Sequence, residues 1–240
     1  MTHLSSAELG TVLSVWAHPD DEAYLAGGLL GALVDAGQRA VCVTATRGEA
    51  ADPTADAAAR AALASVRSSE LESALEVLGV EEHHWLDLPD GGLADADPEG
   101  PVGRLASLVD TVRPDTVLTF GPDGFTGHPD HRAVSRWTER ALDRADHAAD
   151  VRLLHAVTLE RLIDREIVDS FGVYDLGEPR YCTDEELAVR LSLSGRELER
   201  KVRALLAQRS QTAGLVAALG HDRFAAWVAT ECFAPPAITG

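Results

Sequence analysis

The sequence predicts an α/β fold of Rossmann-like type, with a mostly parallel sheet and helices on both of its faces. Over the first 150 residues, short apolar runs typical of strands alternate with amphipathic runs typical of helices, which indicates a parallel sheet with helical crossovers. The 240 residues are 45% hydrophobic and 25% charged, an ordinary globular composition. No internal repeat or linker interrupts the chain, so we expect one domain over residues 1–240.

Four strands are expected in the first half, at 12–17, 40–46, 83–88 and 116–120, where short runs are apolar. Helices are expected between them, at 27–37, at 60–79 and from Pro101 onward. The helix over 60–79 repeats apolar side chains as one helical face would, at Leu63, Val66, Leu71, Leu75 and Leu78. The helix from Pro101 does the same, with Val102, Leu105, Leu108, Val109 and Val112.

The pattern changes after residue 150. The run 153–158 is expected to be one more central strand, and 186–194 a strand at the periphery. One long helix is expected from about 194 to 219, with apolar side chains on one side at Leu198, Val202, Leu205 and Leu206.

The composition also bounds the partners and the location. Lys and Arg total 21 against 39 Asp and Glu, a formal net charge of −18, so we expect no binding to nucleic acid or to a membrane surface. No apolar run reaches the ~18 residues of a membrane helix, and the first residues do not resemble a secretory signal. Cys42, Cys182 and Cys232 form no CxxC pair and are expected to be reduced thiols in a cytoplasmic protein. A homo-oligomer is possible, although nothing in the sequence selects its size.

His-Pro-Asp occurs twice, in HPDD at 18–21 and in HPDH at 128–131. The first tetrad directly follows the strand expected at 12–17, and the second lies in the glycine-rich loop 121–131 after the strand at 116–120. Loops at the carboxyl ends of parallel strands gather along one edge of the sheet, where ligands bind. We therefore expect the two tetrads to lie close together in space.

The first and fourth residues of each tetrad could converge on one metal ion, because positions i and i+3 share a side of a helical turn: His18, Asp21, His128 and His131. Imidazole and carboxylate without thiolate suit zinc or another borderline divalent ion, and three such ligands leave a position open for water. The fourth candidate and the two middle carboxylates would then be available as a base and as a donor to the substrate oxygen. The alternative is that the acids merely cap the helices that follow, but capping gives no role to the histidines.

At these residues the sequence resembles the LmbE-like, or PIG-L, family of zinc-dependent de-N-acetylases. The hallmark AHPDDE (17–22) and the later HPDH are both intact, and the likeness continues through TRGE (46–49), VRSSEL (66–71), LGV (78–80) and LPDGGL (88–93). The segment QRSQ (208–211) is similar to the family's HxSQ helix, with glutamine replacing histidine. The resemblance covers most of residues 11–131 and implies an LmbE-like fold.

Matching positions imply the ligands and the base. The resemblance places zinc on His18, Asp21 and His131, and makes Asp20 the general base that acts on the zinc-bound water. Glu22 is expected to sit at the helix N-terminus without a chemical role.

The resemblance implies four further roles. His128 would stabilise the oxyanion and protonate the leaving amine, and Asp130 would orient His128 and favour its charged form. Arg67 and Asp90 match positions that contact the sugar or its aglycone in relatives. Some mycothiol-pathway relatives carry a tyrosine two residues before HPDH, where this chain has Thr126, which argues against a specific mycothiol assignment.

The function expected from these residues is a zinc hydrolase that removes acetyl from an N-acetylglucosamine-type sugar or conjugate. An amidase for a thiol conjugate or for the N-acyl group of a secondary metabolite is the alternative. A metal phosphoesterase usually needs two metals with bridging carboxylates, and the ligands here suffice for one. A non-catalytic metal or sugar binding module would have no use for both Asp20 and His128.

Overall fold

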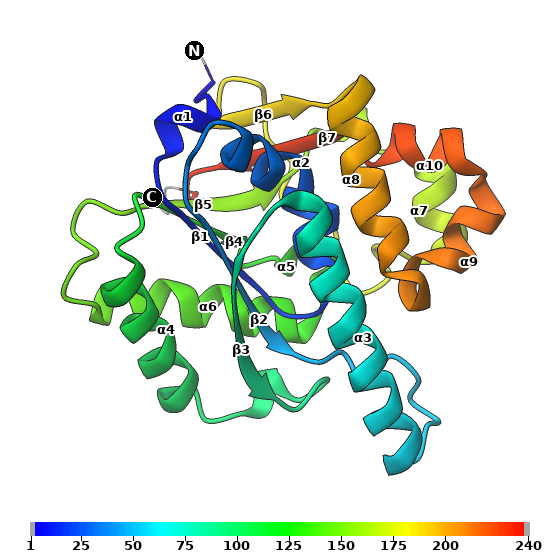
Figure 1. Ribbon diagram of the computed structural model, residues 1–240, viewed down its shortest axis with the longest axis horizontal. Coiled ribbons are helices and arrows are strands. Elements are labelled where there is room, and N and C mark those ends of the chain that lie inside the picture. The colour runs from blue at the N-terminus through cyan, green and yellow to red at the C-terminus, as the bar shows by residue number, and fades with distance from the viewer. Residues whose placement is uncertain (1–2, 238–240) are drawn as a thin grey trace.

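The expected sheet is present and mostly parallel in the computed structural model, which describes residues 3–237. Over those residues, seven strands form one sheet in the order β3-β2-β1-β4-β5-β7-β6 (Figure 1). Neighbouring strands pair in parallel from β3 to β5: β1 (Val12–Trp16), β2 (Ala40–Thr46), β3 (Glu82–Leu88), β4 (Thr116–Phe120) and β5 (Arg152–Val157). At the far edge, β7 (Thr230–Ala234) runs antiparallel to both β5 and β6 (Val189–Ser192).

Helices cover both faces of the sheet, as expected (Figure 1). On one face, α8 (Gly195–Ala207) packs against α2 (Asp21–Asp35) and α3 (Ala57–Leu78). On the other face, α4 (Glu99–Val112) packs against α6 (Pro129–Arg144). Because the sheet lies between these layers, every residue of β1, β2 and β4 is buried, which explains why these strands are nearly continuous apolar runs. The remaining helices are short segments or lie at the edge: α1 (Ser6–Leu9), α5 (Gly124–Gly127), α7 (Arg165–Phe171), α9 (Arg209–Leu219) and α10 (His221–Trp227).

The strand order places a topological switch point between β1 and β4. The chain proceeds from β1 outward to β2 and β3, then returns to β4 on the opposite side of β1. Ligands bind at such a point, beyond the carboxyl ends of the strands. Both His-Pro-Asp tetrads follow the two strands that flank it.

Two helix predictions were wrong in their extent. The helix expected at 27–37 begins at Asp21, inside the first tetrad. The helix expected over 194–219 is two helices, because Gln208 between them leaves helical geometry with φ −90° and ψ 55°. Gln208 is buried, and its side-chain amide donates to the carboxylate of Glu22 on α2 at 2.5 Å. The periodicity of apolar residues does not register such a buried polar contact.

The buried side of α3 also differs from the expected one. Val66 was expected on the apolar face but is 48% exposed, whereas its neighbour Arg67 is buried. The helix is therefore turned so that Arg67 and Ser68 face inward with Leu71 and Leu75. The short strand β7 was not predicted, because TECFA carries only a brief apolar run.

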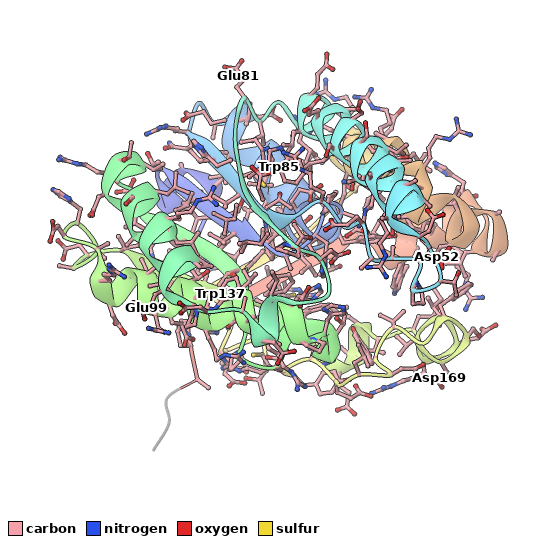
Figure 2. All side chains as sticks on the ribbon, turned by 90° about the horizontal axis from the view of Figure 1, so that it is seen from below. Asp52, Glu81, Trp85, Glu99, Trp137 and Asp169 are labelled. Atoms are coloured by element: carbon pink, nitrogen blue, oxygen red, sulfur yellow. The ribbon has the colours of Figure 1, made fainter. Side chains whose placement is uncertain are left out.

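The described surface is strongly acidic and shows no membrane-spanning segment. Asp52, Glu81, Glu99 and Asp169 are exposed and project outward in Figure 2. Among the helices of residues 3–237, none combines the length and apolar character needed to cross a membrane. The three cysteines are free and buried.

One buried histidine outside the tetrads leads to a prediction about acid stability. His155 on β5 is 1% exposed, and its Nε2 lies 3.4 Å from the partly exposed carboxylate of Glu139 without a hydrogen bond to it among the described residues. Burial, aided by the positive charge of Arg180, lowers the pKa of His155 to about 4. The unfolded chain therefore binds this proton more readily than the folded one between pH 6.5 and 4.

We expect the free energy of unfolding to decrease as the pH is lowered from 6.5 to 4. His155 should contribute up to ~1.4 kcal/mol per pH unit to this decrease. His155→Leu removes this contribution, so its free energy of unfolding should fall less steeply with decreasing pH. Urea unfolding of both proteins at pH 7, 6 and 5 measures the two slopes. Equal slopes would show that His155 accepts its proton in the folded protein as easily as in the unfolded one.

Candidate active site and metal centre

The first tetrad forms the connection between β1 and α2. Asp20 occupies the position before the helix with an unusual positive φ of 112°, and its side chain makes no capping hydrogen bond. Asp21 is the first helical residue, and its carboxylate accepts from the backbone N–H of His18 at 2.8 Å. The strained turn therefore directs Asp20 and Asp21 to different surroundings. Simple helix capping does not explain Asp20.

The second tetrad begins α6. His128 caps this helix, and its Nδ1 accepts from the backbone N–H of Asp130 at 3.2 Å. With Nδ1 as acceptor, the neutral ring carries its proton on Nε2. His131 lies on the first turn, where its Nδ1 donates to the carbonyl of Gly124 at 2.9 Å and its ring stacks on Phe120. This bond leaves Nε2 of His131 as a free acceptor, the arrangement common for metal-binding histidines.

The structure brings His18, Asp21 and His131 together. Nδ1 of His18 lies 3.2 Å from Nε2 of His131 and 3.7 Å from a carboxylate oxygen of Asp21. The other oxygen of Asp21 lies 3.4 Å from Nε2 of His131. Two further groupings have ligand atoms within 4.8 Å of one another: His18 with His128 and His131, and His18 with Asp90 and Asp130. Nitrogen and oxygen donors at this spacing fit a borderline divalent ion such as zinc.

Two carboxylates hold the opposite side of the His18 ring. Nε2 of His18 lies 3.0 Å from Asp90 and 3.4 Å from Asp130. Burial by itself would lower the pKa of His18, but its hydrogen bonds to Asp130 and Asp90 and the charge of Asp21 outweigh burial and raise it to about 10. By contrast, burial lowers the pKa of His131 to about 4. A cation bound between these rings would therefore have to displace a proton from His18.

The partners of Asp130 differ from those expected. Its carboxylate accepts from the backbone N–H groups of Gly91 and Leu93, at 2.8 and 3.0 Å, and faces His18. Asp130 contacts His128 through its own backbone N–H. The structure thus places Asp130 as a support for His18, whereas the resemblance assigned it to His128. The carboxylate of Asp90 contacts His18 and accepts from the backbone N–H of Ala50, and its expected contact with the sugar stays a prediction.

Asp20 lies half-buried beside this candidate metal-binding cluster. Burial raises the pKa of Asp20 to about 7, with the charge of Asp21 acting in the same direction and that of Arg67 opposing both. A carboxylate with a pKa near neutrality is suited to accept and release a proton at physiological pH.

Arg67 holds the loop that carries Asp20. Its guanidinium donates to the carbonyls of Pro19 and Gly48, at 2.5 and 2.8 Å, and lies 3.4 Å from Asp20. Gly48 has no side chain at the point where the guanidinium packs, so any Cβ there would collide with Arg67. The Arg67 side chain is 5% exposed. The structure therefore shows Arg67 bonded to protein groups, whereas the resemblance placed it against the sugar or its aglycone.

The sequence did not indicate the role of Glu22 and Gln208. Glu22 is fully buried, and its carboxylate accepts from the backbone N–H of Asp20 at 3.0 Å and from Gln208. Burial, together with the charge of Asp20, raises the pKa of Glu22 to about 8. These contacts connect the loop that carries Asp20 to the junction between α8 and α9. The segment QRSQ was the only sign of this contact in the sequence.

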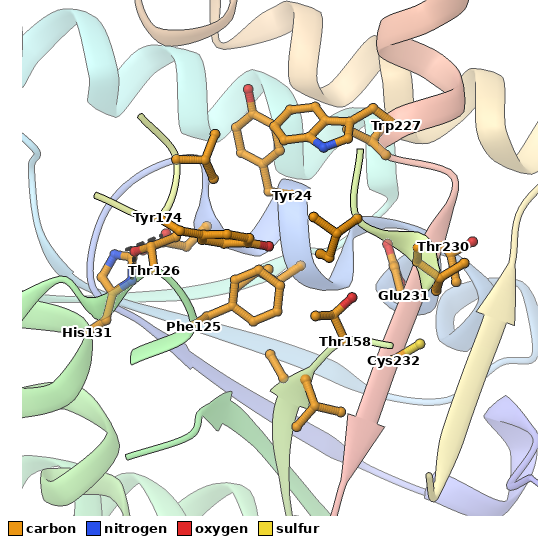
Figure 3. Close-up of a pocket in the computed structure, with 18 of the residues that line it drawn as sticks. Tyr24, Phe125, Thr126, His131, Thr158, Tyr174, Trp227, Thr230, Glu231 and Cys232 are labelled. Carbon is orange, nitrogen blue, oxygen red and sulfur yellow. Dashed lines mark hydrogen bonds and ion pairs between the residues drawn. The ribbon is translucent and has the colours of Figure 1, made fainter. Parts of the chain in front are cut away.

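A cavity of about 310 Å³ opens beside the cluster. Asp21 and His131 form one side of it, and the walls continue through Phe125 and Tyr174 toward Thr230 and Cys232 on β7 (Figure 3). Tyr24 and Trp227 lie together along another wall in Figure 3, with ring centroids 6.0 Å apart. Most of these walls come from residues after 150, where sequence patterns gave least information.

Comparison with known proteins agrees with this architecture and cluster. The family model described as PIG-L, GlcNAc-PI de-N-acetylase, matches residues 13–142. The fold and the paired tetrads thus define a chain of the LmbE-like deacetylase class, and the chain belongs to the PIG-L family.

Two relatives are named as deacetylases of N-acetylglucosamine-type compounds. The chain is 38% identical over 159 residues to a 1D-myo-inositol 2-acetamido-2-deoxy-α-D-glucopyranoside deacetylase from Kineococcus radiotolerans, a match over 55% of this chain and 44% of that protein. It is 30% identical to a probable N-acetyl-α-D-glucosaminyl L-malate deacetylase from Bacillus cereus, over 85% of each chain. The chain spans about half the length of two inositol-type relatives, with matches to 44% and 53% of them.

Solved structures share the fold. An N,N′-diacetylchitobiose deacetylase from Pyrococcus horikoshii aligns with a TM-score of 0.59 at 21% identity, over 84% of this chain and 70% of that one. A 4-carboxy-2-hydroxymuconate hydratase from Pseudomonas putida aligns with a TM-score of 0.65 at 16% identity, over 96% and 98% of the two chains. Since the same fold is found in a deacetylase and in a hydratase, the reaction must be argued from the site.

Proposed function

We propose that this protein is a metal-dependent amide hydrolase that removes an acyl group from the nitrogen of an amino sugar or its conjugate. The observation that carries the proposal is the convergence of His18, Asp21 and His131 beside the half-buried Asp20, whose pKa is raised to about 7. The named deacetylases among its relatives support an N-acetylglucosamine-type substrate. We propose zinc as the metal, because it prefers the nitrogen and oxygen donors present here.

His18, Asp21 and His131 would hold the metal. A zinc ion supplies a water of lowered pKa, roughly 7, and polarises the amide carbonyl. Asp20 would accept the proton from the attacking water, because it adjoins the ligand Asp21 and its pKa is poised near neutrality. Arg67 would keep Asp20 in place through its bonds to the surrounding loop.

His128 would act on the other side of the scissile bond. Its Nδ1 is engaged by the helix cap, so its Nε2–H is the group available to donate. We assign its Nε2–H a hydrogen bond first to the developing oxyanion and then to the departing nitrogen, and the proton that the amine gains is the one that Asp20 took from the attacking water. Asp90 and Asp130 would fix the ring of His18 through its Nε2, as carboxylates commonly do for metal-binding histidines.

Metal analysis and turnover together test this function. We expect one zinc ion per chain and release of acetate from N-acetylglucosaminyl compounds, including the inositol and malate conjugates. Removal of the metal with a chelator should abolish acetate release, and one equivalent of zinc should restore it. Two ions per chain with hydrolysis of phosphate esters would instead favour a phosphoesterase, and binding of these sugars without turnover would favour a binding module.

A further inference from the structure

The cavity beside the metal cluster is larger and more apolar than an acetyl group requires. Its volume of about 310 Å³ is roughly ten times the share of one water molecule in the liquid. The methyl group of an acetyl occupies a space of about one water. A substrate that offered only acetyl would therefore leave most of this cavity without a partner.

The walls of the cavity lack free charged groups apart from the cluster itself. They consist mainly of aliphatic and aromatic side chains, including Leu25, Phe125, Ile163, Tyr174 and Trp227. The further charged residue on the wall, Glu231, is already bonded by Lys201 and by the backbone N–H groups of Gly28 and Leu29, at 2.7 to 2.8 Å. No lysine or arginine lines the cavity among the described residues. The other polar groups on the walls are mainly hydroxyls, those of Tyr24, Thr126, Thr158, Tyr174 and Thr230. A phosphate or a carboxylate would thus find no counter-charge there.

The position of the cavity identifies which side of the amide enters it. Asp21 and His131 line the cavity, whereas Asp20 and His128 do not. In the proposed function the amine leaves toward His128, so the amine and its sugar lie on the His128 side. The substituent on the carbonyl carbon must then point away from His128, past His131 and into the cavity, whose residues extend from His131 to Cys232 in Figure 3.

We propose that this cavity binds a medium-length aliphatic acyl chain, so that the preferred substrates are N-acyl amino sugars with chains of about eight carbons. This inference rests on the proposed function. Hydrolysis breaks the C–N bond and forms a C–O bond from water, and it yields a fatty carboxylate and a protonated amino sugar. The walls that bind the chain come largely from residues 156–174 and 226–232, outside the segment 13–142 that defines the family.

The test compares N-octanoylglucosamine with N-acetylglucosamine on the zinc-loaded protein, below the micelle concentration of the lipid. Both substrates release glucosamine, so one amine assay measures both. We expect kcat/KM to be at least roughly tenfold higher for the octanoyl substrate, because each buried methylene contributes favourably. An equal or higher kcat/KM for the acetyl substrate would overturn the inference and leave the proposed function standing.

Shortening the cavity gives a second test. Cys232 lies at the end of the cavity away from His131 (Figure 3), so Cys232→Phe should lower the octanoyl-to-acetyl ratio of kcat/KM by about tenfold. Val66→Phe, on the exposed side of α3, is the matched control and should leave the ratio unchanged. An unchanged ratio in folded Cys232→Phe protein would contradict the inference.

A binding measurement covers the cases in which Cys232→Phe does not fold or in which neither substrate is hydrolysed. Sodium octanoate titrated into the unmodified zinc-loaded protein should change the tryptophan emission saturably, because Trp227 lines the cavity. Acetate at the same concentrations should not. Failure of hydrolysis with saturable octanoate binding would reject the proposed function but retain the cavity's preference, and absence of octanoate binding would reject that preference.

Discussion

Asp20→Asn is expected to reduce kcat for amide hydrolysis by about 10² to 10⁴-fold while leaving the bound metal in place. The amide has nearly the shape of the carboxylate but cannot accept the proton of the attacking water. Asp20 is not among the three residues that we assign to the metal, and its side chain does not cap α2, so neither metal binding nor the helix start should be lost. Rates of acyl release and metal content per chain, measured on the same preparation, check both parts.

Two variants serve as controls for Asp20→Asn. Asp21→Asn changes the neighbouring carboxylate, which touches both His18 and His131, and should lose activity together with metal. Asp169→Asn alters an exposed carboxylate on α7 (Figure 2) and should change neither. Full turnover in Asp20→Asn would remove Asp20 as the base, and loss of metal in this variant would mean that Asp20 belongs to the ligand set.

The convergence of the two tetrads could be predicted because it depends on topology. The loops that follow parallel strands lie at the same edge of the sheet. The apolar runs before His18 and His128 were clear enough to identify the two strands, and therefore to place both tetrads at that edge. The contact of 3.2 Å between His18 and His131 agrees with this placement. The sequence therefore sufficed to predict that residues in loops at the ends of parallel strands lie near one another.

The contacts around the cluster could not be predicted from the sequence, because they depend on how separate segments of the chain pack together. Asp130 turned toward His18 because the backbone of Gly91 and Leu93, from the loop after β3, approaches α6 and supplies two donors to its carboxylate. The spacing of apolar residues in the loop after β3 and in α6 does not predict that the two segments approach each other. The same holds for Gln208, whose bond to Glu22 accompanies a break in a helix that the apolar pattern predicted to be continuous.

The division of the chain suggests how substrate choice and chemistry are separated. The proposed ligands and base lie within residues 13–142, the span that matches the family. The antiparallel strand β7 and the segments around Tyr174 and Trp227 add cavity walls to this core. These later walls lie outside the residues to which we assign the chemistry, so they are where we expect related chains to differ in the acyl or sugar groups they accept.

The buried ion pair behind the cavity should dominate the stability of the later segment. Lys201 on α8 and Glu231 on β7 are both fully buried at their side chains, with Nζ 2.7 Å from the carboxylate. Lys201 also donates to the carbonyl of Tyr24, and Glu231 accepts from the backbone N–H of Gly28. The pair thereby joins α8 and β7 to α2, the helix whose first residue is Asp21.

We expect Lys201→Met to lower the free energy of unfolding by about 3–5 kcal/mol, because it leaves the carboxylate of Glu231 buried without its counter-charge. Arg161→Met breaks the exposed pair with Asp184 and should cost less than about 1 kcal/mol. The double variant Lys201→Met/Glu231→Leu removes both charges and should recover part of the loss, although Gly28 and Leu29 then lose an acceptor. Urea unfolding of all four proteins measures these differences. A loss in Lys201→Met no larger than that in Arg161→Met would show that the buried pair does not hold α2 against the rest of the fold.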